Sequence, residues 1–220
     1  INAEGTGTDS LTILAGDAAA GGSLTFNGAI GGSQPLSALA INATAGDITL
    51  SLPQIGSGTA AGAGSSSGTV AIGNTGSGDI TFATTNAAGN GAISYIFGGD
   101  TTFKSGGGTD AFQTAGVTTI KNAGSTKSIT FHTGGITLGN AATLTVETTN
   151  GAISLGAVAG TAGGDGTDLT VNAGTATTSL STISTDINDL SVSGTGVITL
   201  TGDVTTEDFT GDDGSQSYSA

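Results

Sequence analysis

The sequence predicts an all-β chain folded as a parallel β-solenoid, and three observations support this fold class. Short units in which two apolar residues flank one small or polar residue recur along nearly the whole chain. Gly, Asn or Ala-Gly follows most of these units, so turns recur about every ten residues. Helix signals are nearly absent, because no window places apolar residues at i, i+3, i+4 and i+7.

Residues 144–155 (LTVETTNGAISL) show the repeated unit most clearly. Each of its two short strands alternates apolar and polar residues, which places one apolar pair on a single face. Asn150-Gly151 lies between the strands, and these residue types tolerate the left-handed backbone conformation. The turn fits a hairpin, and it also fits a corner where a solenoid chain continues around the same axis.

The apolar pairs recur from one end of the chain to the other. They are Leu11/Ile13, Leu24/Phe26, Leu39/Ile41, Ile48/Leu50, Val70/Ile72, Ile80/Phe82, Ile93/Tyr95, Ile129/Phe131, Ile136/Leu138, Leu144/Val146, Ile153/Leu155, Leu169/Val171, Leu190/Val192 and Ile198/Leu200. An antiparallel sandwich or barrel is the alternative, but such short units would fill its core poorly. In a solenoid the same residues stack on their counterparts, and about ten coils of roughly 20 to 24 residues would span ~50 Å.

Composition limits the partners. The 220 residues include 41 Gly, only 4% are aromatic, and three Lys/Arg against 17 Asp/Glu give a net charge of -14. A chain so poor in cations lacks the positive stripe that a phosphate backbone requires, so nucleic acid is not expected as a partner. No apolar run approaches the roughly 20 residues of a spanning helix, so membrane insertion is not expected.

We expect residues 1–220 to form a single solenoid segment, with a flexible loop at 56–68 (GSGTAAGAGSSSG). Tyr95, Ile96 and Phe97 place apolar groups on both faces of one strand. This pattern fits either a strand covered by a loop or a lateral contact with another subunit.

The sequence gives only weak signals for a catalytic site, and we expect that the chain is not an enzyme. Ser66 lies in a G-x-S-x-G match at residues 64–68, but a nucleophile elbow needs a strand before it and a helix after it. His132 is the only histidine and should face solvent, so a zinc site is not expected. The carboxylate pairs nearest to a glycosidase arrangement are Asp186 with Asp189 and Asp212 with Asp213.

Calcium is the only cofactor that the acids suggest. Residues 163–168 and 5–9 partly resemble the calcium-binding nonapeptide repeat, but they are isolated. Asp208, Asp212 and Asp213 form a denser oxygen cluster that a hard cation could use. The alternative is that these Asp residues cap turns through the local backbone. Asn42-Ala43-Thr44 fits the glycosylation pattern, and we interpret Asn42 as a turn residue. The sequence therefore assigns no catalytic, cofactor or metal residue.

Units such as LTVETTNGAISLG, GDITL, DLTVNAG and GVITLTGDVTTEDFTGDDGSQSY resemble those of filamentous-haemagglutinin-like and related large bacterial surface adhesins. The resemblance covers essentially the whole chain. It implies a right-handed parallel β-helix, secretion to the cell surface, and a role as a shaft or adhesive fibre. The N-terminal secretion domain of those proteins is not recognisable here.

We therefore expect a non-catalytic structural or adhesive segment of an extracellular bacterial surface fibre. The alternative is a carbohydrate-binding or carbohydrate-cleaving β-helix module. Neither end shows the amphipathic stripe of a capping helix. We expect further repeats or copies of the same chain, stacked head to tail, to cover both ends. Surface glycans or proteins of a host or neighbouring cell are the other expected partners.

Overall fold

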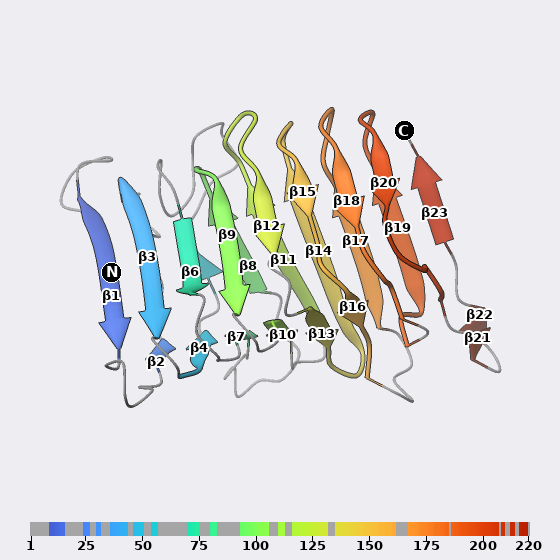
Figure 1. The fold of residues 1–220 in the computed structure, drawn as a ribbon, viewed down its shortest axis with the longest axis horizontal. Coiled ribbons are helices and arrows are strands. Elements are labelled where there is room, and N and C mark those ends of the chain that lie inside the picture. The colour runs from blue at the N-terminus through green and yellow to red at the C-terminus, as the bar shows by residue number, and fades with distance from the viewer. Residues whose placement is uncertain are drawn as a thin grey trace.

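The computed structural model confirms an all-β chain whose parallel strands stack as a β-solenoid (Figure 1). It describes residues 9–15, 24–26, 30–31, 36–43, 46–50, 54–56, 70–74, 80–82, 93–105, 110–112, 116–131, 135–161, 167–184, 186–206, 208–209, 212–213 and 216–219. No helix long and apolar enough to cross a membrane occurs in these ranges.

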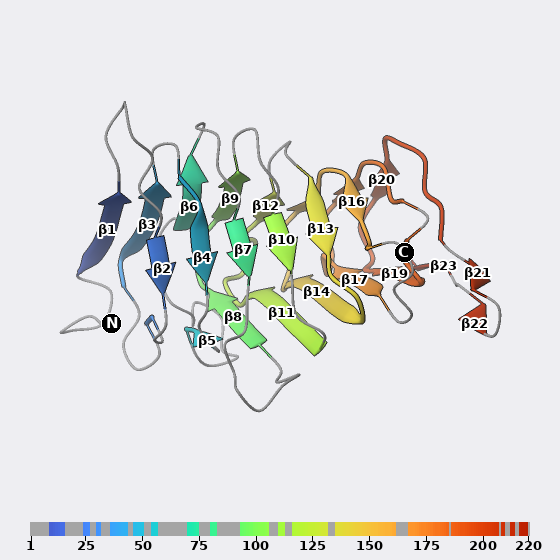
Figure 2. The ribbon, with the colours of Figure 1, turned by 90° about the horizontal axis from the view of Figure 1, so that it is seen from below.

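Three sheets, called A, B and C, form the sides of the solenoid. Sheet B faces the viewer in Figure 2. Sheet A contains β1 (Ser10–Ala15), β3 (Ala38–Ala43), β6 (Val70–Asn74), β9 (Thr101–Ser105), β12 (Ile129–Phe131), β15 (Ile153–Ser154), β18 (Thr178–Leu180) and β20 (Ile198–Leu200). Sheet B contains β2 (Leu24–Phe26), β4 (Ile48–Leu50), β7 (Ile80–Phe82), β10 (Asp110–Phe112), β13 (Ile136–Leu138) and β16 (Val158–Ala159). Sheet C contains β5 (Gln54–Ile55), β8 (Ile93–Phe97), β11 (Gly116–Asn122), β14 (Ala142–Thr148), β17 (Asp168–Asn172), β19 (Asp189–Ser193) and β23 (Gln216–Ser219).

The chain runs from sheet A to sheet B to sheet C and then starts the next coil. Neighbouring strands within the three sheets are parallel, which excludes the antiparallel sandwich for the described strands. Register partners on neighbouring strands lie from 20 positions apart, as for Thr178 and Ile198, to 40 positions apart, as for Gln54 and Ser94, so the coils are more variable in length than expected. Sheet A has eight strands, and the prediction of about ten coils is not confirmed.

The Asn150-Gly151 turn is a corner and not a hairpin. It joins β14 of sheet C to β15 of sheet A, which have no ladder between them. Neither residue has a positive φ, so the turn does not use the left-handed conformation that both residue types tolerate. Gly151 is needed for close approach instead, since a Cβ there would collide with the carbonyl group of Lys127 in the preceding coil.

The core is a set of apolar columns that run along the solenoid axis. In sheet C, strand register stacks aliphatic and aromatic side chains whose exposed fraction is at most 1%. The column consists of Ile55, Tyr95, Ile120, Val146, Val171 and Val192. Alternate residues of the same strands face outward, as the burial pattern of β14 shows. The inward assignment of the apolar pairs is therefore confirmed where side chains are described, apart from the partly exposed pairs of the terminal coils.

Aromatic side chains pack against one another in the core. Phe103 stacks on Phe131 with ring centroids 4.6 Å apart, and Phe97 meets Phe103 edge-on at 5.9 Å. Tyr95 and Phe97 are both fully buried, whereas Ile96 is half-buried on the outer face. Tyr95 and Phe97 therefore cannot form the lateral contact considered from the sequence, because their side chains belong to the core.

Candidate functional site

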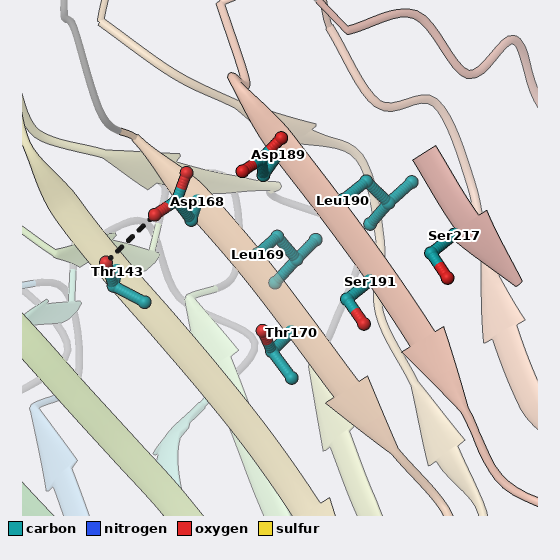
Figure 3. Close-up of a pocket in the computed structure, with 8 residues that line it drawn as sticks. All are labelled: Thr143, Asp168, Leu169, Thr170, Asp189, Leu190, Ser191 and Ser217. Atoms are coloured by element: carbon teal, nitrogen blue, oxygen red, sulfur yellow. Dashed lines mark hydrogen bonds between the residues drawn. The ribbon is translucent and has the colours of Figure 1, made fainter. Parts of the chain in front are cut away.

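The outer face of sheet C carries a groove with a cavity volume of about 350 Å³ (Figure 3). Its lining residues come from strands β14, β17, β19 and β23. They are Thr143, Asp168, Leu169, Thr170, Asp189, Leu190, Ser191 and Ser217. Leu169 and Leu190 are buried beneath the groove, so carboxylates and hydroxyls are the groups that it offers to a ligand.

Strand alternation explains how the groove acquires its polar groups. In both β17 and β19 the burial pattern alternates, with the first, third and fifth residues half-buried on the outer face. Because the two strands pair in register, Asp168 lies beside Asp189, and Thr170 lies beside Ser191. Neighbouring strands are ~4.8 Å apart, so the two carboxyl groups are close neighbours.

Two hydrogen bonds reach the carboxylate of Asp168. Thr143 Oγ1 donates to Asp168 Oδ2 at 3.4 Å, as Figure 3 shows. Asn188 Nδ2 donates to the other oxygen, Oδ1, at 3.5 Å. Both distances are long for hydrogen bonds, so each contact is weak. The carboxylate therefore has one weak donor on each side, one from the adjoining strand β14 and one from the turn before β19.

A row of hydroxyl groups continues along the outer face of sheet C. Successive registers place these side chains next to one another on neighbouring strands. The row consists of Ser94, Thr119, Thr145, Thr170, Ser191 and Ser217. Its spacing is that of the strands, ~4.8 Å. Hydroxyls both donate and accept hydrogen bonds, so the row presents a regular polar surface.

Ion pairs lie beside this row and at one corner. Lys121 Nζ is 3.2 Å from Glu147 Oε2, between neighbouring strands of sheet C. Lys127 Nζ is 3.1 Å from Asp100 Oδ2. The backbone N–H of Ser128, which donates to Asp100 Oδ1 at 2.9 Å, and the Lys127 ammonium together hold the pKa of Asp100 below its ordinary value. These partly exposed pairs contribute little stability individually.

The structure pairs Asp189 with a different carboxylate from the one that the sequence analysis named. Asp189 is registered with Asp168 on the neighbouring strand, which the sequence analysis did not pair with it. Asp186 lies in the turn before β19, where its backbone carbonyl approaches Gly160 of the preceding coil. The signal for the Asp168–Asp189 pair was present, because the units DLTVN and DLSVS both begin with Asp.

The proposed calcium cluster falls at a small antiparallel pair of strands, β21 (Asp208–Phe209) and β22 (Asp212–Asp213). Their backbones place Asp208 opposite Asp213 and Asp212 opposite Phe209. The side chains of the three Asp residues lie outside the described part of the structure. Within the part that is described, no group of three or more His, Cys, Asp or Glu could hold a metal ion.

Several other predicted positions lie outside the described residues. These are His132, the G-x-S-x-G match at 64–68, the loop at 56–68 except Gly56, and residues 5–8 and 163–166 of the two Gly-rich acidic segments. Asn42 is described, and its interpretation as a turn residue is wrong. It lies within β3, and its Oδ1 atom is buried without a hydrogen-bond partner.

No protein-family model, curated protein or solved structure matches the chain. The groove must therefore be interpreted from its own chemistry. Paired carboxylates with flanking hydroxyls can accept hydrogen bonds from a polyhydroxylated ligand. Most glycosidases also use a pair of carboxyl groups for catalysis. The described lining contains neither an aromatic side chain nor a cation.

Proposed function

We propose that the chain is a non-catalytic structural or adhesive segment of an extracellular bacterial surface fibre. The observation that supports this best is the continuity of the three sheets and of the core columns along the solenoid. Each coil is joined to the next by a parallel ladder or a single parallel bridge on each side. Such a stack extends in one dimension by adding coils, as a shaft requires.

The repeat style of the sequence supports the surface location, because it resembles that of filamentous-haemagglutinin-like adhesins. We include in this proposal the right-handed winding that the resemblance implies. The outward hydroxyl row on sheet C supports an adhesive role, since it offers a long polar surface at regular spacing. Host or neighbouring-cell glycans and proteins are the expected adhesion targets.

The location can be tested with an antibody raised against the chain. Immunoelectron microscopy of intact producing cells should label fibres or the outer surface, and brief protease treatment of the cells should remove the label. An antibody against a cytoplasmic protein serves as the control. Labelling that appears only after the cells are permeabilised would overturn the proposal.

The alternative function is a carbohydrate-binding or carbohydrate-cleaving module, and the Asp168–Asp189 pair in the groove favours it. A glycan array and a polysaccharide hydrolysis assay test it directly. Under this alternative, Asp168→Asn combined with Asp189→Asn should abolish binding or turnover. Asp203→Asn is the matched control, because Asp203 is an exposed acid that does not line the groove. Turnover that requires the pair would contradict the non-catalytic role.

A further inference from the structure

The corner between β14 and β15 holds the dipeptide Asn150-Gly151, at the upper edge of the view in Figure 1. Asn is a thermolabile residue type, because the backbone nitrogen of the next residue can attack its side-chain amide carbon. A side chain on that next residue hinders the attack, and Gly has none. Position 151 in turn requires Gly, since a Cβ there would collide with the carbonyl group of Lys127. The packing of the corner therefore demands the most reactive dipeptide.

Thr175 of the following coil places two donors on the amide oxygen of Asn150. Its backbone N–H donates to Asn150 Oδ1 at 3.2 Å, and its hydroxyl donates to the same atom at 2.9 Å. A backbone N–H can only donate, so the atom that faces it is the amide oxygen and not the amide nitrogen. Two donors on one carbonyl oxygen form the arrangement of an oxyanion hole, which stabilises the negative charge that develops when the carbonyl carbon is attacked.

The attacking nitrogen is available at the same corner. Among the described residues, none accepts a hydrogen bond from the Gly151 N–H, so the attack breaks no hydrogen bond of that group. Asn150 is half-buried, and Thr175 is exposed. Water and base from the solvent therefore reach the two reacting groups.

We propose that Asn150-Gly151 is a self-modification site, at which Thr175 assists the attack of the Gly151 nitrogen on Asn150 Cγ. A solvent base removes the proton of that nitrogen, the N–Cγ bond forms, and the two Thr175 donors hold the negative charge on Oδ1. The Cγ–Nδ2 bond then breaks, and the amide nitrogen takes up a proton and leaves as ammonia. The product is a succinimide ring, and the step needs no oxidant or reductant.

Water then opens the ring at one of its two carbonyl groups. Addition at Cγ gives aspartate at position 150, whose carboxylate keeps the two Thr175 donors and binds them more strongly than the neutral amide did. Addition at the backbone carbonyl gives isoaspartate, which adds one carbon atom to the main chain of the corner. Gly151 already lies against Lys127, so the longer main chain must shift the corner between the two coils.

Peptide mapping by mass spectrometry measures the reaction, since conversion of the amide to an acid changes the mass of the peptide. The chain has two other Asn-Gly dipeptides, Asn27-Gly28 and Asn90-Gly91, and mapping separates them from Asn150. At mildly alkaline pH, the folded protein should lose the Asn150 amide faster than the same chain unfolded in guanidinium chloride. A slower loss in the folded protein overturns the proposal.

Thr175→Val tests the role of the hydroxyl, because it removes that donor and keeps the backbone N–H. Thr175 is exposed, so the variant should fold, which circular dichroism checks. It should slow the reaction at Asn150 about fivefold, because a hydrogen bond to a charged acceptor is stronger than one to a neutral acceptor. Thr175→Ser keeps a hydroxyl at this position and should react at the rate of the unchanged chain.

The matched control is Thr177→Val, which alters an exposed Thr of the same corner whose side chain makes no hydrogen bond with Asn150. It should leave the rate unchanged. A Thr175→Val variant that reacts as fast as the unchanged chain, or faster, overturns the proposal, because Thr175 would then restrain the amide instead of activating it. The proposal also fails if Thr177→Val slows the reaction equally, or if Thr175→Ser stays slow.

Discussion

The carbonyl group of Lys127 lies directly against Gly151 of the next coil, so close that a Cβ on Gly151 would overlap it. The neighbouring residue Asn150 contacts the following coil. Its Oδ1 accepts hydrogen bonds from the backbone N–H and Oγ1 of Thr175 at 3.2 and 2.9 Å. The corner between β14 and β15 is therefore held from both adjacent coils.

This contact predicts a strong effect from a single methyl group. Gly151→Ala should lower the free energy of unfolding by about 1–3 kcal/mol, the usual range for overpacking, because the backbone of the corner must move away from Lys127. Chemical denaturation monitored by circular dichroism measures the change. Thr149→Ala is the control, since Thr149 is exposed at the same corner. Equal stability of the two variants would contradict the close approach.

The core assignment makes a second prediction. Ile153 is fully buried in sheet A, so Ile153→Asp places a carboxylate in the apolar interior and should cost several kcal/mol. Thr149→Asp places the same charge on an exposed position and should cost about 0.5 kcal/mol or less. Denaturation midpoints compare the two. Similar midpoints would show that the inward and outward faces have been assigned incorrectly.

Tyr95 predicts a loss of stability at alkaline pH. Burial raises the pKa of Tyr95 above its ordinary value, and its hydroxyl donates to the Leu50 carbonyl at 3.4 Å. The unfolded chain releases the phenolic proton near pH 10, so the stability from the buried neutral form is present below about pH 10. It is lost as the pH rises toward the pKa of the folded state, by at most about 1.4 kcal/mol per pH unit.

Tyr95→Phe should remove this alkaline loss, which thermal melts between about pH 9 and 11.5 can measure. The chain has only two tyrosines, so tyrosinate absorbance separates them well. Tyr218 is 40% exposed, and burial raises its pKa as well. Because it is the more exposed of the two, Tyr218→Phe should change the alkaline slope less. Titration of both tyrosines in the folded protein near pH 10 would refute the burial of Tyr95.

The acidic balance predicts a response to salt. With 17 Asp/Glu against three Lys/Arg, like charges repel across the surface, and added salt should raise the melting temperature by screening. Sodium chloride and calcium chloride compared at equal ionic strength distinguish screening from binding. A larger gain with calcium, lost in Asp212→Asn combined with Asp213→Asn, would support the calcium hypothesis. If neither salt changes the melting temperature, the acidic residues are too far apart for their repulsion to affect stability.

Local alternation in the sequence predicted much of the core but missed part of it. Pairs such as Leu144 and Val146 were recognised because both members are apolar. Ile120 was missed, since its inward neighbour on β11 is Thr118, a buried polar residue that breaks the pattern. Phe103 was missed for the same reason, because Thr101 is the other inward residue of β9.

The sequence by itself determined the inward side chains of the regular apolar pairs, because alternation along a strand is a local property of neighbouring residues. It also determined the strongly acidic surface and the absence of cysteine. Only the tertiary structure decided that Asp168 stands beside Asp189 and that Gly151 lies against Lys127. Those neighbours depend on how many residues each coil contains, and coils vary because their corners and loops differ in length. Register is therefore fixed by packing between coils, which no single repeat unit encodes.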